Sequence, residues 1–377
     1  MDSGISCAGQ QRPRGADGAS GVLTIDLSAL RRNYRSLSQR IAPSRAAAVV
    51  KADAYGLGAE RVARTLYDEG CRDFFVAQFI EADALRPALP RDAQVYVLNG
   101  LQPGAEIACA KSGIVPVLNS LDQLTRWQTA ARAMQRTLPA VLQFDTGMSR
   151  LGFPPQERAS LAAVLEDAAE VEILFVMSHL ACADETQSQQ NDDQRGEMTR
   201  IAKEFRGLDV CLANSGGIFL DDAFHGVLAR PGLALYGGQP TTGARQPIDP
   251  VVRLDVAVIQ TRTVPPGTRI GYGGAQIAED EMHLATIAAG YADGLPRSLS
   301  QRGAVYYKGI RLPIVGRVSM DSIIIDVTAL PDGALQLGTL VEVLGPNQSL
   351  EDVACDAGTI SYEILTRLGH RYHRQYC

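Results

Sequence analysis

Short apolar runs recur between residues 46 and 236, and they alternate with segments whose apolar residues follow helical spacing. The apolar runs predict strands at residues 46–50, 74–78, 94–98, 114–118, 140–144, 173–177, 210–213 and 232–236. The helical spacing predicts helices at residues 60–69, 81–85, 104–110, 121–136, 156–168 and 189–204. Strands and helices that alternate in this way form parallel βα units, and eight such units close into a barrel. We therefore predict an α/β fold whose N-terminal domain, residues 21–250, is a (β/α)8 barrel of the TIM type.

The pattern changes on both sides of this region. Residues 1–20 are mostly small and polar, and we predict that they form a disordered tail. A short strand at residues 22–26 and an amphipathic helix at residues 27–41 lead into the barrel. Residues 239–250 are rich in Gly, Thr and Pro and are typical of a linker. Beyond the linker we predict a mainly β C-terminal domain, residues 251–377, with strands at 251–264, 282–289, 304–307, 312–318, 322–327 and 340–344.

Composition and charge disfavour several classes of partner. The chain has 36 basic and 42 acidic residues, and its net charge of −6 argues against a nucleic-acid or membrane-surface partner. No apolar run reaches the roughly 18 residues that a membrane-spanning helix needs. The seven cysteines are scattered and never spaced as CxxC, so we expect reduced thiols, no metal site and a cytoplasmic protein.

Unusual polar residues follow several of the predicted strands, at the end of the barrel where enzymes of this fold keep their chemistry. Lys51 ends the first strand, Arg150 lies in a turn after the fifth, and His179 follows the sixth. Ser215 follows the seventh strand, and Arg230 leads into the eighth. Each residue has a structural alternative, because a lysine can end a strand in solvent, a histidine can be a hydrogen-bonded core residue, and a serine can cap a helix. Their occurrence at five strand ends of one predicted barrel favours an active site.

Two features indicate what this site does. A lysine in a desolvated cleft loses its proton readily and becomes a nucleophile toward carbonyl groups, which makes Lys51 a candidate Schiff-base residue. The segment Ser215-Gly216-Gly217 offers a hydroxyl and open backbone N–H groups, and Gly232 allows a close backbone approach. Barrels often bind phosphate in the loops after strands seven and eight, so we predict a phosphate site there.

Eight strings, together with the region of His179, resemble the motifs of the alanine racemase family: VVKADAYGLG, DTGMSRLGF, ANSGG, RPGLALYG, GYGG, GYADG, GRVSMD and TISYE. The resemblance runs from about residue 22 to the end of the chain and covers both predicted domains. It implies a barrel followed by a β domain, pyridoxal 5'-phosphate as the cofactor, and a homodimer whose active sites are shared between subunits. It also implies interconversion of L-alanine and D-alanine through an external aldimine, which would supply D-alanine for cell-wall peptidoglycan or serve alanine catabolism.

The same resemblance assigns catalytic roles. Lys51 would carry the cofactor as a Schiff base and act as the base on one face of the substrate. Tyr272, contributed by the other subunit, would be the base on the opposite face. Arg230 would face the pyridine nitrogen, where a guanidinium that keeps its proton leaves the ring a weaker electron sink and favours simple reprotonation. His179 would link Arg230 to Tyr272.

The resemblance also implies binding residues. The cofactor phosphate would be held by Tyr55, Ser215, Gly232, Leu233 and Tyr362. Arg150 would lie beside the phenolic oxygen of the cofactor and the substrate carboxylate. The other subunit would complete the substrate site with Tyr291, Met320 and Asp321.

One position departs from the family pattern. Two residues before the DTGMSRLGF string, many relatives carry a lysine that is carbamylated and orients the arginine, whereas this chain has Gln143. A neutral amide can hydrogen-bond a guanidinium but supplies no counter-charge, so Arg150 would be tuned differently here.

The sequence leaves other functions open. A racemase of another small amino acid, such as serine, would use the same residues. A barrel-fold pyridoxal-phosphate decarboxylase is disfavoured, because an acidic partner in place of Arg230 would suit its chemistry better. A cofactor-carrier barrel without enzyme activity would lack the second domain.

Overall fold

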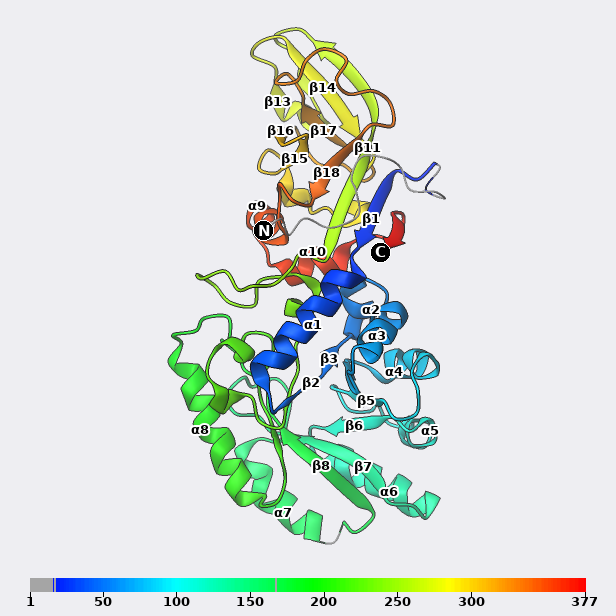
Figure 1. Ribbon diagram of the computed structural model, residues 1–377, viewed down its shortest axis with the longest axis vertical. Coiled ribbons are helices and arrows are strands. Elements are labelled where there is room, and N and C mark those ends of the chain that lie inside the picture. The colour runs from blue at the N-terminus through cyan, green and yellow to red at the C-terminus, as the bar shows by residue number, and fades with distance from the viewer. Residues whose placement is uncertain (1–15, 17, 167) are drawn as a thin grey trace. The chain divides into compact units, whose positions relative to one another are not determined.

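The computed structural model describes residues 16, 18–166 and 168–377, with the helices and strands labelled in Figure 1. The described residues form two compact units. The barrel unit contains residues 31–235 and 239–248, and the β unit contains the described residues up to 30 together with 236–238 and 249–377. The predicted tail at residues 1–20 lies largely outside the described residues.

A parallel sheet forms the core of the barrel unit. Its seven strands pair in the order in which they occur along the chain. They are β3 (Ala48–Val49), β4 (Asp73–Val76), β5 (Gln94–Val97), β6 (Val115–Leu118), β7 (Leu138–Gln143), β8 (Val171–Met177) and β9 (Val210–Cys211). Most of their residues are buried, as expected for parallel strands that are covered on both faces. The first seven predicted strands are thus confirmed to within a few residues.

A short eighth strand closes this sheet into a barrel. β10 (Leu228–Ala229) pairs in parallel with β2 (Arg45–Ala46), which leads directly into β3. On the other side of the same segment, the Val227 N–H donates to the carbonyl oxygen of Val210 in β9 at 2.8 Å. The segment therefore joins both edges of the seven-stranded sheet, and the predicted (β/α)8 barrel is confirmed.

The predicted strand at residues 232–236 is wrong. These residues include η5 (Leu233–Tyr236), a short 3-10 helix, and the closing strand lies immediately before it. The Gly232 N–H donates to Ser215 Oγ at 2.9 Å instead of to a neighbouring strand. A short apolar run fits a buried strand and a buried helical turn equally well, so hydrophobicity alone misplaced the eighth strand.

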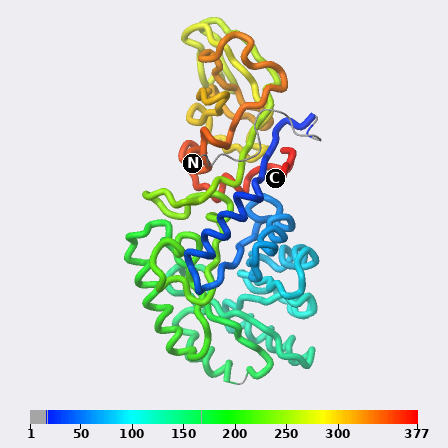
Figure 2. Tube along the Cα trace, in the orientation of Figure 1, coloured from blue at the N-terminus to red at the C-terminus, as the bar shows by residue number. Residues whose placement is uncertain are grey.

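Helices alternate with the barrel strands along the chain, from blue through cyan to green in Figure 2. They are α1 (Leu27–Ile41), α3 (Ala59–Asp68), α4 (Phe79–Leu85), α5 (Glu106–Ser112), α6 (Leu121–Met134), α7 (Arg158–Glu166) and α8 (Gln189–Glu204). Short 3-10 helices in the barrel unit are η1 (Arg86–Ala88), η2 (Pro155–Glu157), η3 (Gly217–Phe219) and η4 (Asp222–Phe224). In α6 the buried residues Leu124, Trp127 and Ala131 recur at helical spacing, as expected for a helix with one apolar face. The predicted helices are confirmed.

An eight-stranded, mostly antiparallel sheet forms the core of the β unit. Its order is β14-β17-β16-β15-β18-β11-β1-β19. The strands are β1 (Gly21–Ile25), β11 (Val252–Val264), β14 (Met282–Ile287), β15 (Ala304–Tyr307), β16 (Ile310–Val315), β17 (Ile323–Asp326), β18 (Leu340–Leu344) and β19 (His373–Tyr376). This confirms the prediction of a mainly β C-terminal part.

The N-terminal strand β1 belongs to this sheet, although the sequence analysis placed its residues with the barrel. Gly21 pairs with Val256 and Ile25 with Val252 in an antiparallel register. Figure 2 shows the blue strand beside the yellow-green β11. The partners are more than 200 positions apart in sequence, so no local pattern could predict the pairing.

Several smaller elements of the β unit were not predicted. They are β12 (Arg269–Ile270), η6 (Tyr272–Gly274), β13 (Gln276–Ile277), η7 (Tyr291–Asp293), η8 (Arg297–Leu299), α9 (Leu350–Ala357) and α10 (Ser361–Arg367). A capping box at the start of α9, where Asp352 accepts a hydrogen bond from the Ser349 N–H at 2.9 Å, was the available sequence signal for that helix.

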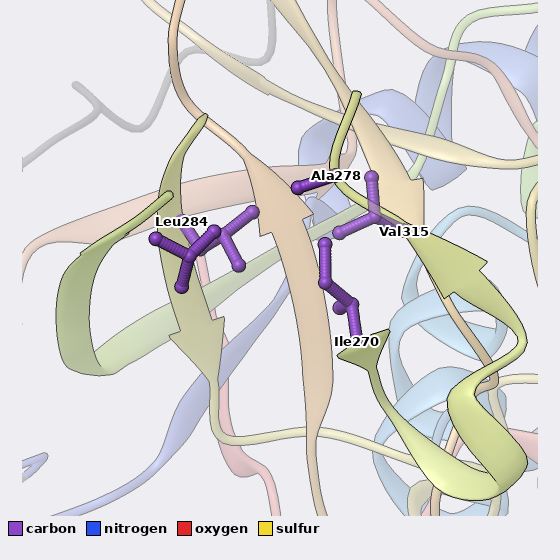
Figure 3. Close-up of a cluster of buried hydrophobic side chains, with 5 residues drawn as sticks. Ile270, Ala278, Leu284 and Val315 are labelled. Carbon is purple, nitrogen blue, oxygen red and sulfur yellow. The ribbon is translucent and has the colours of Figure 1, made fainter. Parts of the chain in front are cut away.

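A small apolar cluster anchors the hairpin formed by β12 and β13. It consists of Val264, Ile270, Ala278, Leu284 and Val315, four of which are labelled in Figure 3. Ile270 and Ala278 lie on either side of the hairpin turn, so burial of their side chains fixes the base of the loop that carries η6.

The thiol groups largely follow the expectation from the sequence. Cys71, Cys109, Cys182, Cys211 and Cys355 are free. Cys377 is disulfide-bonded, which departs from the expectation of reduced thiols throughout. Within the described part of the chain, no helix is both long enough and apolar enough to cross a bilayer.

Candidate active site

Lys51 lies just after β3, at the C-terminal end of the first barrel strand. It opens α2 (Lys51–Gly56), in which Ala52 to Tyr55 all have left-handed backbone angles, with φ between 51° and 57°. Left-handed geometry costs an L-residue roughly 1–2 kcal/mol, so four successive residues form a strained turn. Such strain is frequent at functional sites, and here it directly follows the predicted nucleophile.

The surroundings of Lys51 favour its neutral amine. Burial lowers the pKa of the ammonium group most, and the positive charges of Arg150 and Arg230 lower it further. Glu81 acts in the opposite direction and raises the pKa. A lysine that gives up its proton easily is the form that attacks carbonyl groups.

Arg230 is almost fully buried, at 3% exposure, in the closing strand segment of the barrel. Nη1 donates to the Cys211 carbonyl oxygen at 3.1 Å and contacts Cys211 Sγ at 2.7 Å, and Nη2 donates to the Ser178 carbonyl oxygen at 2.6 Å. Because these bonds all leave from the two Nη atoms, Nε is the donor available to a ligand.

His179 follows β8 and lies within electrostatic reach of the same cations. Burial and the charges of Arg230, Arg150 and Lys51, in that order, lower the pKa of its imidazole to about 3. The ring is therefore neutral near pH 7. Among the described residues, no hydrogen bond joins its ring to Arg230, so the two are coupled here through charge.

A second group of residues forms a cradle in the loops after β9 and β10. Ser215 Oγ accepts hydrogen bonds from the Gly232 N–H at 2.9 Å and the Ala234 N–H at 3.3 Å. The hydroxyl of Tyr55 lies against Gly232 so closely that a Cβ atom on Gly232 would be 2.4 Å from it. A Cβ atom at position 232 would displace the Tyr55 side chain, and the two hydroxyl groups and the backbone meet where phosphate binding was predicted.

Arg150 lies at the end of a tight turn after β7. Asp145 Oδ1 accepts hydrogen bonds from the N–H groups of Gly147, Met148 and Ser149 at 2.9–3.1 Å, which holds the turn. Gln143 is buried at the end of β7. Within the described residues no hydrogen bond joins the Gln143 amide to the Arg150 guanidinium.

A buried polar network behind these loops was missed by the sequence analysis. Gln194 of α8 is fully buried; its Nε2 donates to Thr146 Oγ1 at 3.0 Å and to the His179 carbonyl oxygen at 2.9 Å. Thr146 Oγ1 in turn lies 2.7 Å from Ser178 Oγ. The network ties the loop after β7 to the loop after β8. Its signal in the sequence was that Gln194 shares one helical face with the buried residues Met198 and Ile201.

Leu233 of η5 is buried in the barrel unit, and the remaining predicted residues lie on the β unit. Tyr272 projects from η6 with 71% of its surface exposed, in a loop whose glycines Gly271 and Gly273 have positive φ. Tyr291 and Met320 lie on adjacent loops, because the Tyr291 N–H donates to the Ser319 carbonyl oxygen at 3.1 Å and the Ala292 N–H to the Met320 carbonyl oxygen at 3.0 Å.

Asp321 is held by Arg371, which also binds the buried Asp293. Tyr362 of α10 is 39% exposed. A group of exposed tyrosines and a methionine beside an ordered backbone is chemically suited to contact a ligand or a second chain.

The residues of the barrel unit fit pyridoxal 5'-phosphate. A neutralised lysine can bind its aldehyde, the cradle of Tyr55, Ser215 and Gly232 can hold its phosphate, and Arg230 Nε can face its ring nitrogen. Among residues 16, 18–166 and 168–377, no group of three or more His, Cys, Asp or Glu side chains could hold a metal ion.

Comparison with known proteins identifies the family. The model of the alanine racemase N-terminal domain matches residues 25–240, and the model of the alanine racemase C-terminal domain matches residues 251–376. A protein of Rhizobium johnstonii named "Alanine racemase, catabolic" is 68% identical over 376 residues, which are 100% of both chains. A protein of the same name from Agrobacterium fabrum is 58% identical, over 100% of this chain and 96% of the relative.

A solved structure gives the same result for the fold. The alanine racemase of Bartonella henselae, determined with covalently bound pyridoxal phosphate, is 44% identical and superposes with a TM-score of 0.92. The match covers 95% of this chain and all of that chain. Since both family models match and full-length relatives exceed half identity, this chain belongs to the alanine racemase family.

Proposed function

We propose that this protein is a pyridoxal-phosphate-dependent racemase that interconverts L-alanine and D-alanine. The observation that carries the proposal is the Lys51 amine, whose pKa is lowered by burial and by Arg150 and Arg230 at the mouth of the barrel. The names of the relatives and of the solved structure support alanine as the substrate and pyridoxal phosphate as the cofactor. No observation favours serine over alanine.

When bound, pyridoxal phosphate supplies an electron-withdrawing ring that stabilises negative charge at the substrate Cα. In one direction the neutral Lys51 Nζ accepts the proton from Cα on one face of the substrate, and the Tyr272 hydroxyl donates a proton to Cα on the opposite face, which inverts the centre. In the reverse direction the Tyr272 phenolate accepts the proton from Cα and the Lys51 ammonium group donates one. Arg230 would hydrogen-bond the ring nitrogen without transferring its proton, so the ring would be a weaker electron sink suited to proton exchange at Cα.

The same proposal assigns the binding roles. Tyr55, Ser215, Gly232 and Leu233 hold the phosphate, with Tyr362. Arg150 and the Met320 N–H bind the substrate carboxylate, and the neutral His179 couples Arg230 to Tyr272. Tyr272, Tyr291 and Tyr362 leave a small pocket for the methyl group of alanine, and Asp321 completes the substrate site.

The active site belongs to a homodimer in this proposal. Tyr272, Tyr291 and Met320 are exposed on the β unit, at 71%, 45% and 52% respectively. Their exposure supports a second copy of the chain as the surface that covers them. Each site then takes Lys51 from one subunit and Tyr272 from the other.

The biological role is the supply of D-alanine for cell-wall peptidoglycan or alanine catabolism. The two relatives named as catabolic support the catabolic role of the two roles left open by the sequence. The free thiols of five cysteines support a cytoplasmic location. Growth of a strain that lacks the gene, with D-alanine as the carbon source, tests the role, and cell fractionation tests the location.

A racemisation assay tests the function directly. The purified protein, with and without added pyridoxal phosphate, is incubated with a panel of L-amino acids, and D-isomers are quantified by chiral chromatography. We expect cofactor-dependent turnover that is highest for alanine and absent in Lys51→Ala. Borohydride reduction and peptide mapping should place the cofactor on Lys51. Equal turnover of serine would contradict the specificity, and label on another lysine would contradict the role of Lys51.

A further inference from the structure

Glu81 lies close to the reactive lysine, although no motif of the sequence analysis includes it. Its carboxylate accepts three backbone hydrogen bonds. Oε2 accepts from the Ala77 N–H at 2.8 Å and the Gln78 N–H at 2.9 Å, at the start of α4. Oε1 accepts from the Ala52 N–H at 2.5 Å. One carboxylate therefore joins the first turn of α4 to the peptide group that follows Lys51.

The bond to Ala52 acts on the strained part of the chain. Residues 52–55 are left-handed, and such a conformation persists only where the surroundings hold it. Two further bonds of this turn are local: the Ala54 N–H donates to the Val50 carbonyl oxygen, and the Ala59 N–H donates to Asp53 Oδ1. The bond from Ala52 to Glu81 spans 29 positions and ties the turn to a neighbouring βα unit.

Glu81 also supplies the negative charge in the electrostatic surroundings of the lysine amine. Arg150, from the loop after β7, and Arg230, from the closing strand, both lower the pKa of Lys51, and Glu81 alone raises it. His179, after β8, adds no charge near neutral pH because its own pKa is lowered to about 3.

We propose that Glu81 is a positioning residue for Lys51: its carboxylate holds the left-handed turn that aims the lysine amine and places a negative charge opposite two arginines. The proposal rests on the proposed function, in which Lys51 bears the cofactor and exchanges the substrate proton. Glu81 itself would contact neither the cofactor nor the substrate.

The substitution Glu81→Gln separates this role from the capping of α4. The amide oxygen can still accept from Ala77 and Gln78, but the amide NH2 then faces the Ala52 N–H, donor against donor. A matched control is Asp352→Asn, because Asp352 is the acid of the capping box of α9 and lies on the β unit. Both variants lose one capping charge, and only Glu81→Gln releases the turn after Lys51.

Two measurements on the full-length chain test the proposal. Competitive labelling with an amine reagent across pH, followed by peptide mapping, gives the pKa of Lys51 before cofactor is added. Steady-state kinetics give kcat and KM after loading. We expect Glu81→Gln to lower the Lys51 pKa and to reduce kcat about ten-fold or more with a smaller change in KM, the size expected for loss of a charge-assisted hydrogen bond. Asp352→Asn should match the wild type in both.

A purely structural role gives a different result. If Glu81→Gln lowers the melting temperature and activity but leaves the Lys51 pKa unchanged or raised, the proposal is wrong. Unchanged kcat would also overturn it. The labelling result does not depend on the substrate, so a lowered pKa in a protein that fails to racemise alanine would retain the positioning role and reject the proposed function.

Discussion

At the scale of single residues, the site is organised by the distribution of charge around one amine. Lys51 is surrounded by two guanidinium groups and one carboxylate, and burial together with the guanidinium groups favours its unprotonated form. Burial and the same cations lower the pKa of His179, so its ring is neutral near pH 7. The Arg230 guanidinium is hydrogen-bonded to backbone carbonyl oxygens in the barrel wall. Burial and the fixed positive charges together thus favour the neutral forms of both Lys51 and His179.

The amide at Gln143 leads us to predict that activity does not depend on carbon dioxide. An amide cannot be carbamylated, so turnover should be the same in carbon-dioxide-free buffer and in bicarbonate, measured as racemisation rate. Gln143→Lys should lower activity in carbon-dioxide-free buffer, because it places a cation near Arg150, and bicarbonate should restore it in part. If removal of dissolved carbon dioxide reversibly abolishes turnover of the unmodified protein, this reasoning fails.

His179 makes a prediction about acid stability. Its pKa is about 3 in the folded chain and near 6.5 when unfolded, so the unfolded chain binds one more proton between these values. Stability should therefore fall as pH drops from about 6.5 toward 3, with a contribution from this group of up to about 1.4 kcal/mol per pH unit. Urea denaturation at several pH values should show a shallower fall for His179→Gln than for the wild type. Identical pH slopes in the two proteins would show that this histidine is not the group responsible.

At the scale of elements, the left-handed turn α2 is the unusual feature of the barrel. It connects β3 to α3, and its first residue is Lys51. Directly after Lys51, the backbone of residues 52–55 changes to left-handed angles. The network of Gln194 fixes two other loops in the same way, so the mouth of the barrel is built from loops that are tied to helices.

The turn makes a prediction that can be tested by stability. Ala52 is exposed and has φ 51° and ψ 48°, so Ala52→Gly removes the cost of left-handed geometry without removing packing. We expect a gain of about 1 kcal/mol in the free energy of unfolding from urea denaturation.

The control is Ala162→Gly in α7, an exposed alanine in a right-handed helix. The same change there should cost about 1 kcal/mol. If both substitutions destabilise to a similar extent, the turn is not strained.

At the scale of the whole molecule, the two residues proposed as bases lie on different units. Lys51 belongs to the barrel unit, and Tyr272 belongs to a loop of the β unit that is anchored by the apolar cluster in Figure 3. The exposed Tyr272 side chain is the one that would complete the active site of a second subunit. A two-fold dimer offers two equivalent composite sites of this kind.

Mixing of inactive variants tests the shared site. Lys51→Ala and Tyr272→Ala should each be nearly inactive, because each removes one base from both sites of a dimer. In a reassorted mixture, about half of the dimers contain one chain of each kind, and one of their two sites has both bases intact. Roughly a quarter of wild-type activity should return if exchange is random and the sites are independent.

Differently tagged subunits show whether reassortment has occurred. If mixed dimers form and no activity returns, Tyr272 acts within its own chain.

Local sequence determined the regular part of the fold. The strands β3 to β9 and the helices between them follow from apolar spacing, which depends only on neighbouring positions. The strings around Lys51, Arg150 and His179 were sufficient to place these residues after strands, because the end of an apolar run is visible in the sequence. Arg230 was predicted to precede the eighth strand, whereas it follows the closing strand β10. The linker and the turn signals in the C-terminal part were sufficient to indicate its β structure.

Tertiary structure decided the features that depend on distant partners. β1 joins the β unit because it pairs with β11 and β19. The closing strand lies at Leu228–Ala229 because this segment pairs with β2 on one side and is hydrogen-bonded to β9 on the other. The left-handed turn after Lys51 is held by Glu81, and the loops after β7 and β8 are held by Gln194. In each case a backbone group or a buried polar atom is satisfied by a residue far away in sequence. The requirement that buried hydrogen-bonding groups find partners is a property of the folded molecule, and periodicity along the chain does not contain it.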